Sequence, residues 1–111
     1  MGFELITEMN RLQKELTKSI SLLRSNGSKL AQMERDYKIE LRQQALILRA
    51  DGVAVTLIDK IVYGVPSVAE ARFKRDEAQC LYDANREHLN VVKLQLRVLG
   101  EQYRVEFGNG G

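Results

Sequence analysis

The stretch ADGVAVTLIDKIVYGVPSVAEARF, residues 50–73, carries two glycines and the only proline of the chain between two long segments of helical composition. Gly52 predicts the end of the preceding helix, because glycine readily takes the left-handed backbone that closes a helix C-terminus. Val65 and Pro66 predict an extended link, since proline disfavours helical backbone in the residue before it. The stretch therefore predicts a corner between two helices that run in opposite directions.

A short helix is expected inside this corner, over about residues 56–63. Thr56 and Asp59 have the spacing of a capping box, in which a hydroxyl and a side chain three residues later satisfy free backbone N–H groups. Gly64 is expected to end the short helix in a left-handed conformation. The corner should therefore hold about two turns of helix.

The second long helix is expected over about residues 68–107, and Ser67 with Glu70 has the spacing of the capping box that would start it. A glycine turn between two helices is also typical of helix-turn-helix proteins, which read DNA. In that arrangement Lys60 would stand where close helix packing needs a small side chain, and Glu70 where the second helix needs a branched aliphatic one. A recognition helix of about forty residues would also extend far beyond the groove. These features favour a plain corner.

The first long helix is expected over about residues 3–50, because apolar residues recur there every three or four positions. Asn26-Gly27 falls inside this pattern and would mark a turn in many sequences. The pattern keeps its phase across these two residues, which a loop would have no reason to preserve, so one uninterrupted helix is predicted. The apolar positions are Leu5, Met9, Leu12, Leu16, Ile20, Leu23, Gly27, Leu30, Met33, Tyr37, Leu41, Ala45 and Leu48.

The last helix has apolar residues on two sides, which we call the first and the second stripe. A helix that is apolar on two sides needs two neighbours, and the first long helix can cover only one stripe along its length. A second copy of the chain is the natural cover for the other. The first stripe contains Tyr82, Leu89, Val92, Leu96, Leu99 and Tyr103, and the second contains Phe73, Cys80, Ala84, Val91, Leu94, Val98 and Val105.

These stripes give two groups of predicted contact residues. The seam of the hairpin is expected at Leu89, Val92, Leu96, Leu99 and Tyr103, and the contact between subunits at Val91, Leu94, Val98 and Val105. The pattern leaves open which stripe is intramolecular, so the two assignments can be exchanged. Asn85 also lies in the first stripe, where a buried amide would fix the register of the helices; partial exposure at a helix crossing is the alternative.

Length and composition indicate one domain, expected over residues 1–107, followed by a flexible tail over residues 108–111. The net charge is only +2, which is no polybasic signature. Cys80 is the only cysteine, so an intrachain disulfide is excluded and a reducing, cytoplasmic compartment is favoured. No apolar run approaches the roughly 20 residues that a membrane span needs, and no membrane partner is expected.

No residue pattern in the sequence indicates catalysis, a cofactor or a metal. Cys80 has no base at helical spacing, so it is expected to be a small core residue instead of a nucleophile. His88 is the only histidine and lacks the further ligands that a metal site needs, although at an interface it would gain charge in acid. The protein is therefore expected not to be an enzyme.

Four blocks of the sequence resemble a family of small, uncharacterised helical proteins encoded by bacteriophages and prophages of Gram-positive bacteria. The resemblance covers most of residues 20–107 and implies the cytoplasm of an infected host, but it assigns no activity to any residue. Residues 62–66 are more apolar than the charged link typical of that family, which argues against an exposed loop there. The blocks are Glu34–Ile39, Leu48–Val53 with Val55–Ile58, Val68–Asp76, and Asn90–Arg97.

The sequence thus predicts an all-α fold, a long antiparallel, coiled-coil-like helical hairpin with a short connecting helix that assembles into a homo-oligomeric bundle of two or more subunits. The expected function is that of a non-catalytic interaction or scaffold protein, with a host or phage protein as a further candidate partner. The alternative is an accessory protein of phage DNA replication or recombination that binds nucleic acid through a basic helix face. That face would use the acid-free segment at residues 17–33, with Lys18, Arg24 and Lys29, for which a solvated helix surface is the competing interpretation.

Overall fold

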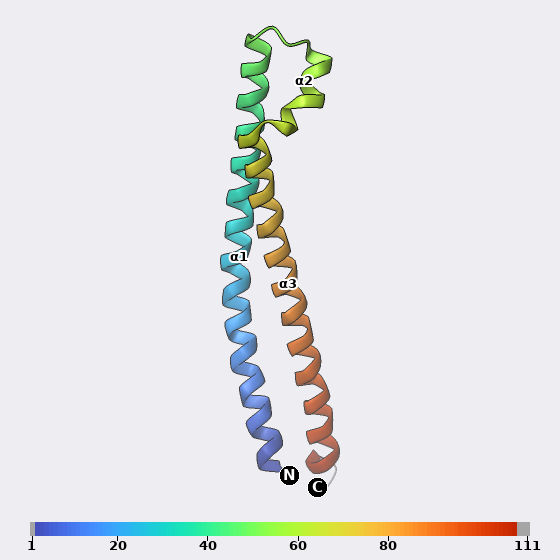
Figure 1. Ribbon diagram of the computed structural model, residues 1–111. Helices are drawn as coiled ribbons and strands as arrows, with labels where there is room; N and C mark the ends of the chain where they lie inside the picture. Colours follow the sequence, from blue (N-terminus) through green and yellow to red (C-terminus); the bar gives the residue numbers. More distant parts are fainter. Residues whose placement is uncertain (1, 109–111) are drawn as a thin grey trace. The chain divides into compact units, whose positions relative to one another are not determined.

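The computed structural model describes residues 2–108, and all their regular elements are helical. α1 spans Gly2–Ala50, α2 spans Val55–Ile61 and α3 spans Pro66–Tyr103. A 3-10 turn at Val62–Gly64 links α2 to α3, and a π-helical turn at Arg104–Gly108 follows α3. The predicted helical hairpin with a short connecting helix is confirmed (Figure 1). Residues 109–111 of the predicted tail lie outside the described residues.

The packing of the helices divides the chain into two compact units. Unit 1 combines the residues up to 25 with those from 83 onward, and unit 2 holds residues 26–82. In each unit a part of α1 lies beside a part of α3 that runs in the opposite direction (Figure 1). Unit 2 also contains α2 and the corner.

α1 passes through Asn26-Gly27 without a break, as the apolar pattern predicts. Gly27 lies against the ring of Tyr82 on α3, and a Cβ atom at Gly27 would be 3.4 Å from Cε2 of that ring. The aromatic side chain thus packs on helix backbone at this position. The helix continues through Gly27 despite the low helix propensity of glycine.

The end of α1 follows the prediction for Gly52, which has a φ of 89°. The N–H of Gly52 donates a hydrogen bond to the Arg49 carbonyl (3.1 Å), and the N–H of Val53 donates one to the Leu48 carbonyl (3.1 Å). These two bonds form a Schellman motif, which satisfies carbonyls that a helix end leaves free. Leu48 and Val53 both pack against the core of unit 2, so the motif also ties the corner to that core.

The predicted caps of the short helix are wrong. α2 begins at Val55, and its N-cap is Ala54, whose carbonyl accepts hydrogen bonds from the N–H groups of Leu57 (2.9 Å) and Ile58 (3.0 Å). Thr56 is therefore already inside the helix and cannot cap it. Gly64 does not take a left-handed conformation either, because Gly52 is the one residue with positive φ in the described part of the chain.

The start of α3 also differs from the prediction. Val65 is extended, with a ψ of 127°, and its carbonyl accepts hydrogen bonds from Val68 N–H (3.0 Å) and Ala69 N–H (2.9 Å). Pro66 then occupies the first helical position, where its fixed φ suits a helix and its missing N–H costs nothing. Ser67 therefore lies two residues after the cap position and cannot form a capping box with Glu70.

The core of unit 2 is entirely apolar at its centre and draws on every element of the corner. Tyr37 from α1, Ile58 from α2, Val62 from the 3-10 turn and Val68 from α3 are buried together. Burial of these branched and aromatic side chains is the main force that holds α2 against the long helices. The partly buried residues around them are Leu41, Ala45, Leu48, Val53, Val65 and Ala71.

The core of unit 1 is a single layer between two helices. Leu5 and Leu12 of α1 and Leu89 and Val92 of α3 are buried in it, together with Ser19, which is only 3% exposed. Ile20, which belongs to the apolar pattern of the first helix, is 39% exposed instead of buried. Ser19 lies seven residues after Leu12, so it occupies the same side of α1 as the two buried leucines.

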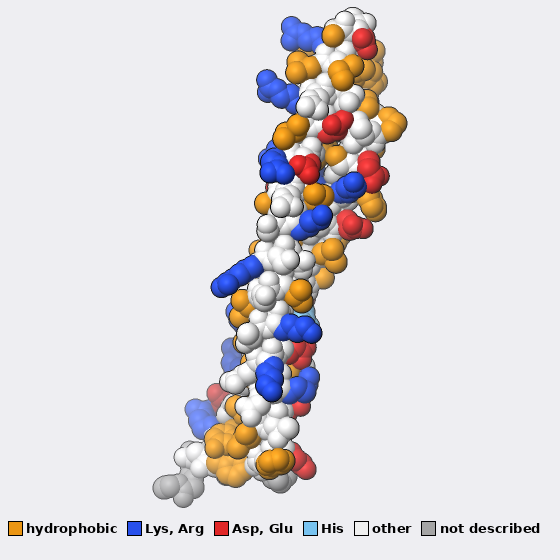
Figure 2. All heavy atoms as spheres, turned by 90° about the vertical axis from the view of Figure 1, so that its left-hand side faces the viewer, with side chains coloured by type: hydrophobic (Ala, Val, Ile, Leu, Met, Phe, Trp, Pro, Cys, Tyr) orange, Lys and Arg blue, Asp and Glu red, His pale blue; other side chains and the backbone are white. Residues whose placement is uncertain are grey.

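The surface carries charges of both signs. Figure 2 shows Lys and Arg side chains spread along one face with Asp, Glu and hydrophobic side chains between them. Within residues 2–108, no helix combines the length and the apolar character that crossing a membrane demands.

Candidate interaction surface

The residues predicted for the hairpin seam lie at graded depths in unit 1. Leu89 and Val92 are buried, and Leu96 and Leu99 are half-buried. Tyr103 is 39% exposed, and its ring packs on that of Phe107 with centroids 5.0 Å apart. The first stripe thus faces α1 in the middle of unit 1 and becomes exposed toward the end of α3.

A polar pair interrupts the apolar layer of unit 1. The amide of Asn85 on α3 donates hydrogen bonds to Ser19 of α1, at 2.9 Å to Oγ and 3.2 Å to the carbonyl oxygen. Ser19 is buried and Asn85 is partly buried, so an amide placed elsewhere would leave the hydroxyl without this donor. The pair therefore favours one register of α1 against α3 in unit 1. Sequence reasoning identified Asn85 but missed Ser19, whose seven-residue spacing from Leu12 was the available signal.

A charged cluster spans the two helices of unit 1 at the surface. His88 Nε2 lies 3.0 Å from Glu15 Oε1, while Arg11 donates to Glu15 Oε2 (3.1 Å) and also pairs with Glu8. The hydrogen bond from Arg11 lowers the pKa of the Glu8 carboxyl below its ordinary value. Among the described residues, no group of His, Cys, Asp and Glu side chains has the arrangement of a metal site. The cluster is a surface ion-pair network, and such networks contribute little to stability.

The residues predicted for the subunit contact form an exposed apolar row along α3 and the π-helical turn after it. Val91, Leu94, Val98 and Val105 are between 43% and 67% exposed, and Val105 is the one that lies in the π-helical turn. They belong to unit 1, and no described part of that unit covers them. Cys80, which was predicted to be a core residue, is exposed instead, because it lies on the outer side of α3 together with the second stripe.

A shallow groove of about 370 Å³ borders this row in unit 1. Leu94 and Val98 form one side of it, and Leu12 lies at its base. Because the lining is largely apolar, the groove suits a hydrophobic side chain of a partner better than a polar substrate. Its complete lining is Glu8, Leu12, Leu94, Gln95, Val98 and Leu99.

The cations of the acid-free segment are divided between the two units. Lys18 and Arg24 are exposed in unit 1, and their separation of six positions corresponds to a rotation of roughly 120° around the helix, so they do not form one patch. Lys29 belongs to unit 2, where it lines a groove together with Lys74 and the acidic Glu77.

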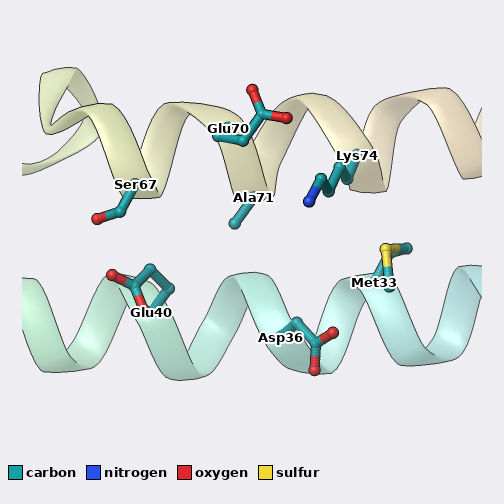
Figure 3. Close-up of a pocket in the computed structure, with 7 residues that line it drawn as sticks. All are labelled: Met33, Asp36, Glu40, Ser67, Glu70, Ala71 and Lys74. Carbon is teal, nitrogen blue, oxygen red and sulfur yellow. The ribbon is translucent and has the colours of Figure 1, made fainter.

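A second groove, of about 350 Å³, lies in unit 2 and is lined mainly by polar and charged side chains of the kinds that serve in catalysis (Figure 3). Ser67 and Glu40 point toward one another across it, and the hydrogen bond from Ser67 lowers the pKa of the Glu40 carboxyl, with help from Gln44. Gln44 donates to Glu40 at 2.9 Å. Asp36, Glu70 and Lys74 line the remaining rim, and no activated nucleophile is found among these side chains.

The exposed apolar row and the grooves of the two units lie along helices and therefore suit packing against a helix of a partner. Comparison of the chain with protein-family models, with curated proteins and with solved structures yields no match.

Proposed function

We propose that the protein is a non-catalytic interaction or scaffold protein that acts as a homo-oligomer of helical hairpins. The observation that carries this proposal is the exposed row of Val91, Leu94, Val98 and Val105 along one side of α3 and the π-helical turn after it. Contiguous exposed apolar residues cost free energy in water and are typical of surfaces that bind another protein. A second copy of the chain is the partner that is always present at the concentration of the protein itself.

The neighbouring features support contact with a protein. The groove beside the row is apolar, and Glu8 and Gln95 at its edge supply the polar rim that is common around such interfaces. The resemblance to small phage and prophage proteins adds that the assembly acts in the cytoplasm of an infected host, where a phage or host protein is its further partner.

A substitution in the centre of the row tests the proposal. Val98→Asp places a charge in the contact and should dissociate the oligomer while the helix content, measured by circular dichroism, stays unchanged. Asn90→Asp adds the same charge to an exposed position of α3 outside the row and should leave the mass unchanged. Loss of helix content together with assembly in the Val98 variant would instead assign Val98 to the hairpin seam.

A further inference from the structure

The end of α1 in unit 2 exposes a face that combines apolar and basic side chains. Ile39 is 49% exposed and Leu46 is 54% exposed, although they lie on a helix whose other side packs into the core of unit 2. Figure 2 shows basic, hydrophobic and some acidic side chains over the upper part of the face turned to the viewer. We call this surface the basic-apolar face; it consists of Lys38, Ile39, Arg42, Leu46 and Arg49.

No exposed carboxylate interrupts this face. Glu40 is the only acidic residue between positions 37 and 50, and it is half-buried on the side of α3 with Ser67. Arg42 and Arg49 take part in no salt bridge with the rest of residues 2–108, and Lys38 has only Glu34 at 3.7 Å. Arg42 and Arg49 therefore present uncompensated positive charge beside the half-exposed aliphatic side chains of Ile39 and Leu46.

The spacing of these residues is that of a helix-helix seam. Arg42 and Arg49 are seven residues apart, and Ile39 and Leu46 have the same interval; Arg35, seven residues before Arg42, continues the first row but pairs with the exposed Asp36 at 3.3 Å. Seven residues are close to two helical turns, so each set forms a row along the helix, and the two rows are neighbours. In coiled coils an apolar row flanked by charges of one sign pairs with a helix that carries the opposite sign.

The geometry points to an acidic amphipathic helix of another protein as the ligand of the basic-apolar face. Stabilisation of a helix C-terminus by cations accounts for Arg49, but it gives no reason for the exposed Ile39 and Leu46. A phosphate backbone would be bound by the cations and would leave the apolar row in water. A helix with aliphatic residues and glutamates on one side satisfies both rows. The surface is separate from the second stripe in unit 1 and goes beyond the proposed self-association.

Two synthetic peptides test this inference. Each is 21 residues long, with three heptads of Ile and Leu on one side; the flanking positions are Glu in one peptide and Lys in the other. Fluorescence anisotropy with the full chain should detect micromolar binding of the Glu peptide that weakens as salt rises, and no comparable binding of the Lys peptide.

Charge reversal gives the sharper arm of the test. Arg42→Glu with Arg49→Glu should weaken the Glu peptide by about tenfold or more and allow the Lys peptide to bind. The control, Arg24→Glu with Arg86→Glu, makes the same change of charge in unit 1 and should leave both affinities unchanged. Ile39→Gln with Leu46→Gln keeps the charge and should also weaken the Glu peptide, which shows that both rows contribute. Circular dichroism establishes that each variant is folded.

Several results would overturn the inference. It is wrong if the Glu peptide fails to bind, if both peptides bind equally, or if charge reversal has no effect on a folded variant. Tighter binding of a 20-base-pair DNA duplex than of the Glu peptide would identify a nucleic-acid surface instead. If the variant with Arg42→Glu and Arg49→Glu forms a smaller assembly than the wild-type protein, the ligand of the face is a second copy of the chain and the inference is wrong. A monomeric wild-type protein that binds the Glu peptide would refute the proposed function and leave this inference intact.

Discussion

Unit 1 and unit 2 are built from the same two helices, yet they bury their apolar residues in different ways. In unit 2 the corner brings α2 and the 3-10 turn against α1 and α3, and Tyr37, Ile58, Val62 and Val68 close a core from four elements. In unit 1 two helices meet along one layer, and the buried Ser19 lies among its leucines. Two helices alone can bury only the sides that face each other.

This difference explains where the strongest candidate for self-association lies. The outer side of α3 in unit 1 carries Val91, Leu94 and Val98, and no element in the described part of unit 1 covers them. Unit 2 also exposes aliphatic residues, but on its α1 face they stand beside cations, which suits a charged partner. The two units therefore offer two chemically distinct surfaces.

Removal of the α2 side chain from the core of unit 2 should have the largest effect on stability. Ile58→Ala leaves a cavity between α2 and the long helices and should lower the free energy of unfolding by about 3 kcal/mol. Urea unfolding followed by circular dichroism measures the loss. Leu57→Ala changes the neighbouring, exposed residue and should cost less than about 0.5 kcal/mol. Equal losses in the two variants would contradict the assignment of Ile58 to the core.

The polar pair of unit 1 should follow in size. Asn85→Ala takes away the donor of the buried Ser19 hydroxyl, and the free energy of unfolding should fall by about 2 kcal/mol. Ser19→Ala combined with Asn85→Ala should cost less than the sum of the single changes, because the second change then removes no further bond. Strictly additive losses in urea unfolding would mean that the two side chains do not interact.

A methyl group at Gly27 should have a smaller effect of the opposite sign. Gly27→Ala should stabilise the protein by about 0.5 to 1 kcal/mol, because alanine is the better helix former and 3.4 Å is an ordinary contact distance to Tyr82. Gly52→Ala should destabilise it by about 1 kcal/mol, since the left-handed backbone there strains any side chain. Thermal unfolding of both variants measures whether each change raises or lowers stability. Destabilisation by Gly27→Ala would show that the Tyr82 ring cannot move to make room for the methyl group.

The smallest expected effect concerns the acid titration of Glu40 in unit 2. Ser67→Ala should raise the pKa of Glu40 toward its ordinary value of 4.5, because the hydrogen bond from Ser67 is the first cause of its lowering. A lowered folded-state pKa adds stability above the ordinary pKa, and that stability is lost as the pH falls through the folded-state pKa. The variant should therefore lose less stability in acid than the wild type. Carbon-13 NMR of the carboxyls measures the change in the pKa of Glu40. The pKa of Glu8, which pairs with Arg11 in unit 1, should stay unchanged.

The helices were predictable from the sequence because their signals are repeated or local. Thirteen apolar positions kept one phase through Asn26-Gly27, and Gly52 has a backbone requirement that few other residues meet. The helix starts were not predictable in the same way. The carbonyls of Ala54 and Val65 do the capping, and any residue type has a carbonyl, so the hydroxyls of Thr56 and Ser67 misled the prediction.

The candidate surfaces could be predicted only in part. The apolar pattern separated two stripes on α3, but it did not indicate which would be covered, because that depends on how α1 packs in each unit. Ser19 was missed since a buried serine becomes reasonable only when the amide of Asn85 is known to face it. The basic-apolar face was missed as well. In the sequence, Glu40 gives the segment charges of both signs, and only the structure shows that this carboxylate lies on the side of α3.

The most direct test of the central claim is the mass of the wild-type protein in solution. Light scattering on a gel-filtration column at micromolar concentration should give a dimer or a larger assembly, because residues 2–108 of a single chain leave the apolar row of unit 1 exposed. A compact monomer at that concentration would contradict the claim that a second copy covers Val91, Leu94, Val98 and Val105.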